Sequence, residues 1–162
     1  MQISTPYTLA ALGLMTLLMM GCATSPTASV NPAQANEVTF TAMQQVGKPY
    51  RYGGSSPQTG FDCSGLVGYV YRESVGIKLP RSVKDLSAMP APAVDKNHLE
   101  TGDLVIFATR HGKQADHAGI FVGKGRFVHA PSTGGKVRLD TINDDYWRNS
   151  FLIGKRPLAK NH

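Results

Sequence analysis

Hydrophobic positions follow two different periods along the chain. After Asp62 they repeat with the spacing of one helix face, at Leu66, Val67, Val70 and Tyr71. From residue 103 onward, short apolar runs are separated by polar and Gly-rich segments, which is the pattern of strands joined by turns. Helices in the first half followed by an antiparallel sheet in the second predict an α+β fold.

The helix after Asp62 has clear predicted ends. Aspartate is a favoured N-cap residue, so Cys63 would occupy the first helical position, and Gly76 supplies a stop signal. In the same way, Ser82 predicts a second short helix ahead of a Pro-rich segment. An earlier helix would begin near Val38 and end before the Gly and Pro that follow it.

Five segments in the second half have the composition of strands. We expect them to form the antiparallel sheet, and they are residues 103–108 (DLVIFA), 117–123 (HAGIFVG), 126–130 (RFVHA), 136–140 (KVRLD) and 151–157 (FLIGKRP).

The apolar run over residues 9–20 (LAALGLMTLLMM) has the shape of an export signal. It is shorter than the about 20 apolar residues that a membrane-spanning helix needs, and it ends in small residues. The adjoining LMMGC resembles the lipobox of bacterial lipoproteins, in which the cysteine, here Cys22, becomes the lipidated first residue. This resemblance implies a lipoprotein signal peptide over residues 1–21, and Ala23 then favours the periplasmic face of the outer membrane. An ordinary cleaved signal, with Cys22 lost or incidental, is the alternative.

One folded domain is expected from the length and composition. The chain has 162 residues, of which 41% are apolar, and this suffices for one core. The segment after Cys22 holds no aromatic residue and is rich in Ala, Ser, Thr and Pro, so we predict that it is a flexible tether. We therefore expect the lipidated cysteine and tether over residues 22–37, a domain over 38–158 and a tail over 159–162.

The charge of the chain favours an anionic partner. The formal net charge is +6, and residues 1–21 carry no charged side chain. Lipid headgroups and the acidic stem peptides of the cell wall both suit such a surface. Nucleic acid is not expected, because the basic residues are scattered singly, without a run or an interleaved aromatic motif.

The presence of Cys63 needs a chemical explanation. The chain has two cysteines, and if Cys22 is acylated, Cys63 is left as a lone thiol in an oxidising compartment. A thiol at a helix N-terminus has its pKa lowered by the backbone N–H groups and the helix dipole. The same N–H groups could hold the oxyanion that forms when the sulfur attacks a carbonyl. The position therefore suits a nucleophile.

A nucleophilic cysteine needs a base and a group that orients the base. Of the five histidines, only His117 and His129 fall in predicted strands. If the two strands form a hairpin centred on Lys124, Gly119 faces His129 and His117 lies one diagonal step away on the same face. A two-residue turn would instead place the histidines on opposite faces, unless a bulge corrects the register.

Six motifs follow one another over nearly all of residues 38–158, namely PYRYGG, DCSG, LPRS, GDLVIF, HAGIFVG and FVHAP. With these motifs the chain resembles the NlpC/P60 family of cell-wall cysteine peptidases. The resemblance implies a papain-like fold, with N-terminal helices that carry the nucleophile packed on an antiparallel sheet. It also implies hydrolysis of amide bonds in peptidoglycan stem peptides, as in the small outer-membrane lipoproteins of the family.

The resemblance also implies roles for single residues. The family nucleophile falls on Cys63, its base on His117 and its third polar residue on His129. Tyr50 matches a tyrosine whose hydroxyl lies beside the cysteine, as a second oxyanion donor. Asp62 and Ser64 match positions that line the substrate groove, and Asp62 is also the predicted helix cap.

Two alternatives belong to other classes of protein. Cys63, His117 and His129 could be three zinc ligands, although the short ligand spacings typical of zinc sites are missing. The chain could also be a peptidoglycan-binding lipoprotein without turnover. On the peptidase interpretation we expect no cofactor or metal, a monomer, and two candidate bonds. These are the D-Ala to diaminopimelate cross-bridge, slightly favoured, and the D-glutamyl to diaminopimelate bond.

Overall fold

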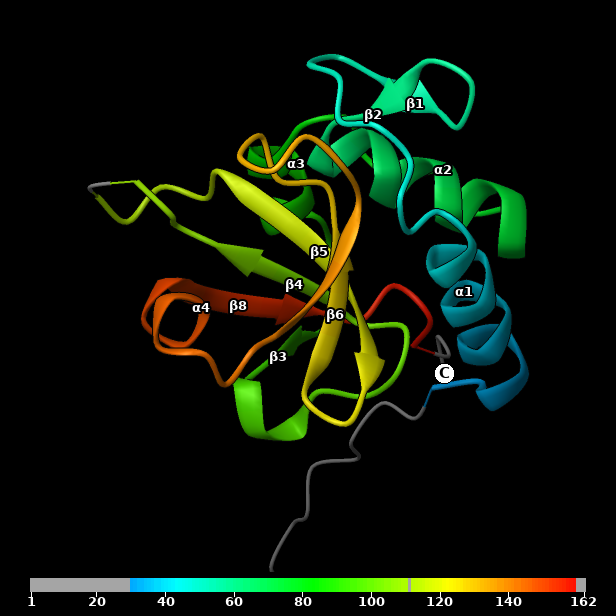
Figure 1. Ribbon diagram of the computed structural model, residues 1–162. Helices are drawn as coiled ribbons and strands as arrows, with labels where there is room; N and C mark the ends of the chain where they lie inside the picture. Colours follow the sequence, from blue (N-terminus) through cyan, green and yellow to red (C-terminus); the bar gives the residue numbers. More distant parts are fainter. Residues whose placement is uncertain (1–29, 111, 160–162) are drawn as a thin grey trace, which may run out of the picture.

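The computed structural model of the protein describes residues 30–110 and 112–159. Its elements in chain order are α1 (Pro32–Gln44), β1 (Ser55–Ser56), β2 (Gly60–Phe61), α2 (Cys63–Val75), α3 (Val83–Ala88), β3 (Ala93–Val94), η1 (Lys96–His98), β4 (Leu104–Phe107), β5 (His117–Gly123), β6 (Arg126–His129), β7 (Arg138–Thr141), α4 (Asp145–Ser150) and β8 (Phe151–Lys155). Six strands form an antiparallel sheet in the order β3-β8-β4-β5-β6-β7. Helices α1 and α2 lie on one side of this sheet and α4 on the other (Figure 1). The α+β prediction is confirmed.

Helix α1 begins earlier than the sequence pattern predicts. Asn31 caps it by accepting a hydrogen bond from the Ala33 N–H at 3.1 Å, and Pro32 suits the first helical position, where no N–H partner is needed. The helix buries Ala35, Val38 and Ala42. The predicted tether up to residue 37 is therefore too long. Two of the three buried side chains are alanines, which give only a weak hydrophobic period.

The two described ends of the chain meet. Val30 forms an isolated antiparallel bridge with Ala159, and Leu158 is buried beside them in the main core. The folded domain therefore includes Val30 to Ala159. The predicted signal peptide and Cys22 lie outside the described residues. None of the helices within residues 30–110 and 112–159 combines the length and the apolar composition that a membrane-spanning helix needs.

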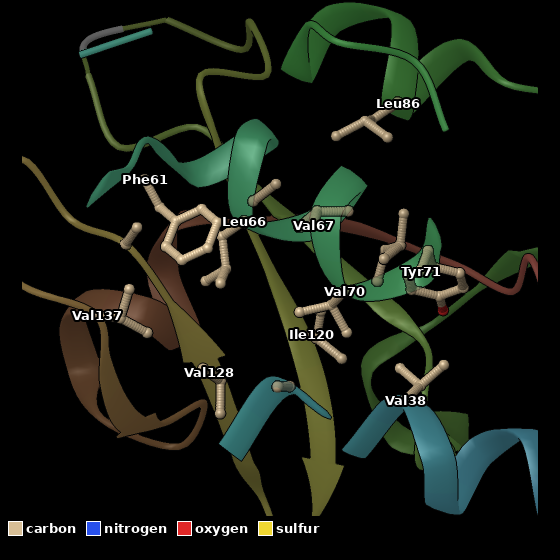
Figure 2. Packing of buried hydrophobic residues seen from close by; sticks show 14 of the residues in the cluster. Val38, Phe61, Leu66, Val67, Val70, Tyr71, Leu86, Ile120, Val128 and Val137 are labelled. Atoms are coloured by element: carbon tan, nitrogen blue, oxygen red, sulfur yellow. The ribbon is translucent and has the colours of Figure 1, made fainter. Parts of the chain in front are cut away.

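Helix α2 is the buried centre of the domain. Asp62 caps its start and Gly76, in the left-handed conformation, ends it, as predicted. Figure 2 shows its apolar side chains packed in one cluster with Val38 of α1 and Ile120 of the sheet. A helix buried on so much of its surface holds its first residue, Cys63, in a fixed place against the sheet.

Strand β4 is buried on both faces, which explains its four consecutive apolar residues. Leu104 and Ile106 pack in the same cluster as α1 and α2. Val105 and Phe107 pack instead with Trp147 of α4 on the opposite face. The domain thus has two apolar layers separated by the sheet.

The hairpin of β5 and β6 has the register that brings the two histidines to one face. Gly119 pairs with His129, as the centred hairpin predicts. The turn itself is the two-residue alternative, because Lys124 and Gly125 have φ values of 52° and 69°. A register shift between Phe121 and Gly123 adds one residue to β5, so that His117 and His129 still lie on the same face of the sheet.

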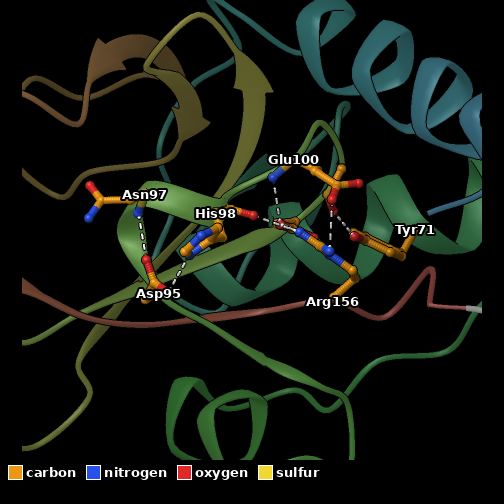
Figure 3. Close-up of polar contacts among 8 residues, drawn as sticks. Tyr71, Asp95, Asn97, His98, Glu100 and Arg156 are labelled. Atoms are coloured by element: carbon orange, nitrogen blue, oxygen red, sulfur yellow. Dashed lines mark hydrogen bonds and ion pairs between the residues drawn. The ribbon is translucent and has the colours of Figure 1, made fainter. Parts of the chain in front are cut away.

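A buried arginine fixes the start of β4 relative to the end of β8. Arg156, just after β8, makes two hydrogen bonds of 2.9 Å to the Asp103 carboxylate and one of 2.8 Å to the His98 carbonyl. Figure 3 shows the arginine among these groups, beside Tyr71 of α2. The Tyr71 hydroxyl donates to the Gly102 carbonyl. This polar cluster ties α2 to the sheet that carries the histidines.

Candidate active site

Cys63 begins α2, at the position that the capping signal predicts. Oδ1 of Asp62 accepts from the Gly65 N–H at 2.7 Å, and Oδ2 accepts from the Gly53 N–H at 2.9 Å. Gly65 must lack a side chain, because a Cβ there would lie 2.0 Å from the Gly54 carbonyl oxygen. The preceding loop therefore packs directly on the first turn of the helix. The cysteine itself is partly exposed.

The pKa of the Cys63 thiol is raised, whereas the sequence predicts that it is lowered. Burial raises the pKa of Cys63, while backbone hydrogen bonds from Ala118 and Ser64 oppose that rise. The helix N-terminus alone would lower the pKa, but the cost of burying a thiolate outweighs it. At neutral pH the resting cysteine is therefore a thiol.

The two histidines are hydrogen-bonded to each other. His117, at the start of β5, places Nε2 at 2.8 Å from Nδ1 of His129 on β6. Gly119 provides the room, because a Cβ there would meet Phe127 at 2.7 Å and the His129 Cβ at 3.2 Å. The predicted pairing of the two rings is therefore present, and the second ring nitrogen of His117, Nδ1, is left for another partner.

Aromatic side chains enclose the histidine pair. The indole of Trp147 stacks on His117 with ring centroids 5.4 Å apart, and it meets His129 edge-on at 4.9 Å. The rings of Phe127 and His129, both on β6, have their centroids 4.8 Å apart. Burial lowers the pKa of His117 to about 3 and that of His129 to about 4. Both rings are therefore neutral at pH 7, which is the state that a general base requires.

Asp140 ends this chain of polar contacts. Its Oδ2 lies 3.0 Å from Nε2 of His129, and it also accepts from Nε1 of Trp147 at 3.0 Å. Arg138 donates to the same oxygen from Nη2 at 2.8 Å and from Nε at 3.1 Å. The polar chain thus runs from His117 through His129 to a carboxylate on β7.

Cys63 and His117 line one cavity of about 620 Å³. Tyr50, Asp62 and Ser64 also line it, so five of the six candidate active-site residues border this cavity. His129 lies behind His117 and is fully buried. The cavity is thus bordered by a thiol, a neutral imidazole and a phenol.

Tyr50 lines the same cavity as the Cys63 thiol. The pKa of Tyr50 is raised by burial and by the neighbouring Cys63. Its hydroxyl is therefore protonated at neutral pH and available as a donor in the cavity.

Arg81 makes a polar network with Asp62 and Ser64, the two residues predicted to line the substrate groove. Its guanidinium forms hydrogen bonds to both carboxylate oxygens of Asp62, at 2.9 and 2.8 Å, and one to the Ser64 hydroxyl at 2.7 Å. Asp62 therefore caps the helix and also holds a cation on the cavity wall. Arg81 lies within the LPRS motif, but its contact with Asp62 arises only from the tertiary fold.

Three further residues beside the histidines were missed by the sequence analysis. Asp116 accepts from the Thr109 and Arg110 N–H groups, at 2.7 and 2.9 Å, and so fastens the loop before His117. Asp140 could not be placed, because a loop separates β6 from β7 and the register of these strands is free in sequence. Trp147 could not be placed, because it lies on α4, which is too short to show a helical period. The alternation of KVRLD puts residues 138 and 140 on one face, which was the only available signal.

The geometry does not suit a zinc site built from Cys63, His117 and His129. Both ring nitrogens of His129 face protein groups, one His117 and the other Asp140. His129 thus presents no nitrogen to the cavity that holds the thiol. Among the described residues, no three His, Cys, Asp or Glu side chains are grouped as metal ligands.

Comparison with known proteins gives consistent matches. Residues 47–156 match the NlpC/P60 family. Murein DD-endopeptidase MepH of Escherichia coli (strain K12) is 40% identical over 137 residues, which are 82% of this chain and 51% of MepH. Gamma-DL-glutamyl hydrolase of Bacillus subtilis (strain 168) is 40% identical over 124 residues, which are 76% of this chain and 30% of that protein.

Solved structures agree with these sequence matches. The crystal structure of an NlpC/P60 family protein from Bacillus cereus ATCC 10987 superposes with a TM-score of 0.71 at 31% identity, covering 81% of this chain and 42% of that chain. The chain thus spans about half the length of MepH and less than a third of the Bacillus subtilis hydrolase. Sequence, papain-like fold and site geometry agree that this chain belongs to the NlpC/P60 family.

Proposed function

We propose that this protein is a cysteine endopeptidase that hydrolyses amide bonds in peptidoglycan stem peptides. The observation that carries the proposal is the shared cavity, which is lined both by Cys63 at the start of a buried helix and by His117, itself hydrogen-bonded to His129. The relatives named as a murein DD-endopeptidase and a gamma-DL-glutamyl hydrolase support this substrate class.

The first step is attack by sulfur on a stem-peptide carbonyl. Because the pKa of Cys63 is raised and that of His117 is lowered to about 3, the resting pair is a thiol and a neutral imidazole. The proton therefore passes from Cys63 to His117 as the sulfur attacks, and not before. His117 then protonates the leaving amine, and water, activated by the same base, hydrolyses the acyl-enzyme.

The oxyanion formed in each step needs donors close to the sulfur. The N–H of Cys63 at the helix N-terminus supplies one, and the protonated Tyr50 hydroxyl in the same cavity supplies the second. Asp62, Ser64 and the Arg81 that binds both form the wall that the substrate contacts.

Two bonds are candidates within this substrate class. The D-Ala to diaminopimelate cross-bridge is favoured, because it is a bond that a DD-endopeptidase would cleave and MepH is named a murein DD-endopeptidase. The D-glutamyl to diaminopimelate bond is the alternative, which the gamma-DL-glutamyl hydrolase likeness supports at the same identity over a shorter overlap.

Digestion of purified peptidoglycan tests the proposal. The protein and its Cys63→Ala variant are incubated with peptidoglycan, and the released fragments are identified by mass spectrometry. Loss of cross-linked dimers to intact monomers indicates the cross-bridge, whereas stems shortened after glutamate indicate the alternative bond. Well-folded protein without any Cys63-dependent product would contradict the enzyme and favour a binding protein.

We also propose that a lipid on Cys22 anchors the domain at the periplasmic face of the outer membrane. Because the described domain reaches back to Val30, only the seven residues 23–29 separate it from Cys22, a reach of at most about 30 Å. Such an anchor would hold the active site close to the membrane. Incorporation of labelled palmitate in wild type, and its loss in Cys22→Ala, tests this proposal. An unlabelled wild-type protein would contradict it.

A further inference from the structure

Asp140 is the only carboxylate bonded to the histidine pair among the described residues, and it lies at the end away from the thiol. Four donor contacts converge on its Oδ2: one from His129, one from Trp147, and two from Nε and Nη2 of Arg138. Arginine and tryptophan can only donate hydrogen bonds. The carboxylate therefore accepts hydrogen bonds from Arg138 and Trp147, which cannot act as acceptors themselves, and these bonds hold it in place.

The ionisation state of Asp140 agrees with this geometry. Burial by itself would raise the pKa of Asp140, but hydrogen bonds from Arg138 and the neighbouring His129 outweigh burial and lower it. The side chain is thus an anion at neutral pH. Since an ionised carboxylate can only accept, the His129 nitrogen that faces it must carry a proton.

The proton positions then follow one from the next. His129 is neutral, so a proton on Nε2 leaves Nδ1 as a lone-pair acceptor. Nδ1 of His129 lies 2.8 Å from Nε2 of His117, which must therefore donate. His117 is neutral as well, so its Nδ1 is left unprotonated. The arrangement allows one tautomer for each ring.

We propose that Asp140 is a positioning residue that fixes the tautomers of His129 and His117 and thereby leaves Nδ1 of His117 to receive the Cys63 proton. The proposal deepens the proposed peptidase function and rests on it for its effect on turnover. Without the carboxylate, His129 could carry its proton on either nitrogen. A His129 proton on Nδ1 would face the Nε2 proton of His117 and break their hydrogen bond.

Imidazole 15N NMR of the full chain tests the proposal without substrate, because the nitrogen shifts report which ring nitrogen is protonated. At pH 7 we expect protons on Nε2 of both His129 and His117. In Asp140→Ala we expect His129 to populate both tautomers, with kcat on peptidoglycan about 10- to 100-fold lower and KM nearly unchanged. In Asp140→Asn the amide oxygen still accepts from His129, so the tautomers should be retained with an intermediate kcat.

Asp145→Asn is the matched control. Asp145 is on α4 beside Trp147 but pairs with Arg148 and is highly exposed, so its loss should change neither the tautomers nor kcat. A wild-type His129 protonated on Nδ1 would overturn the proposal, even if Asp140→Ala did not fold. A folded Asp140→Ala with wild-type tautomers and kcat would also overturn it. If the tautomers behave as expected but wild type releases no fragments, the peptidase proposal fails and the assignment of the tautomers stands.

Discussion

Nε2 of His117 lies 2.8 Å from Nδ1 of His129, and the two rings meet nearly edge-on at 87°. The contact spans neighbouring strands one diagonal step apart and depends on the bulge beside the Lys124 turn. Because both rings are buried in a packed sheet, the base and its partner are held rigidly before substrate binds.

Replacing His129 should weaken catalysis without abolishing it. In His129→Ala we expect kcat to fall about 10- to 100-fold, because His117 loses the group that orients it while the nucleophile remains. Turnover should still exceed that of Cys63→Ala. Steady-state rates of fragment release, measured on protein with a normal circular dichroism spectrum, check this. Wild-type kcat in His129→Ala would show that the third-residue assignment is wrong.

A methyl group at Gly119 should disturb both packing and the histidine pair. The added Cβ would lie 2.7 Å from Phe127 and 3.2 Å from the His129 Cβ, so Gly119→Ala should cost about 1–3 kcal/mol of unfolding free energy and lower kcat. Urea denaturation measures the first effect and fragment release the second.

Gly68→Ala provides the control for this substitution. Gly68 lies inside α2, and a Cβ there would meet nothing within 4 Å. Alanine should therefore stabilise the helix by about 0.5–1 kcal/mol. Equal effects of the two substitutions on stability would contradict the crowding argument at Gly119.

Trimming the chain to Val38 should destabilise the domain. The deletion removes the Asn31 cap, buried Ala35 and the bridge between Val30 and Ala159. We expect a loss of several kcal/mol, a large part of the about 5–15 kcal/mol typical of a domain. Thermal unfolding of chains that begin at Val30 and at Val38 measures it. Equal melting temperatures would show that residues 30–37 contribute nothing.

Stability should fall in mild acid because both histidines are buried as neutral rings. Their pKa values drop on folding from 6.5 to about 3 for His117 and about 4 for His129. The unfolded chain therefore binds more protons than the folded chain between pH 6.5 and these values. The stability present above pH 6.5 is thus lost as the pH falls toward about 4 for His129 and about 3 for His117. Chemical denaturation at several pH values checks the slope, which His129→Gln should reduce. A slope unchanged in that variant would contradict the assignment.

Much of the fold could be predicted from local signals. Strand β5 occupies 117–123 as predicted, and α2 begins at Cys63 and stops at Gly76 because capping and glycine stops act within a few residues. The start of α1 was missed because alanines form most of its buried stripe, and α4 because six residues are too few to show a period.

The sequence by itself determined the identity of the reactive groups. The cysteine at a capped helix start, two histidines in adjacent strands and the order of the family motifs are all local or ordered features. Even the hairpin register could be narrowed to two alternatives, since side chains alternate strictly along a strand.

Only the tertiary structure decided the electrostatics and the supporting groups. Burial raises the pKa of Cys63 even though the helix N-terminus would lower it. The exclusion of solvent from a side chain cannot be inferred from its neighbours in sequence. Asp140 and Arg81 reach the site through contacts with residues 11 and 19 positions away. Such contacts depend on the register and packing of elements joined by loops, because loop sequence does not fix how distant segments dock.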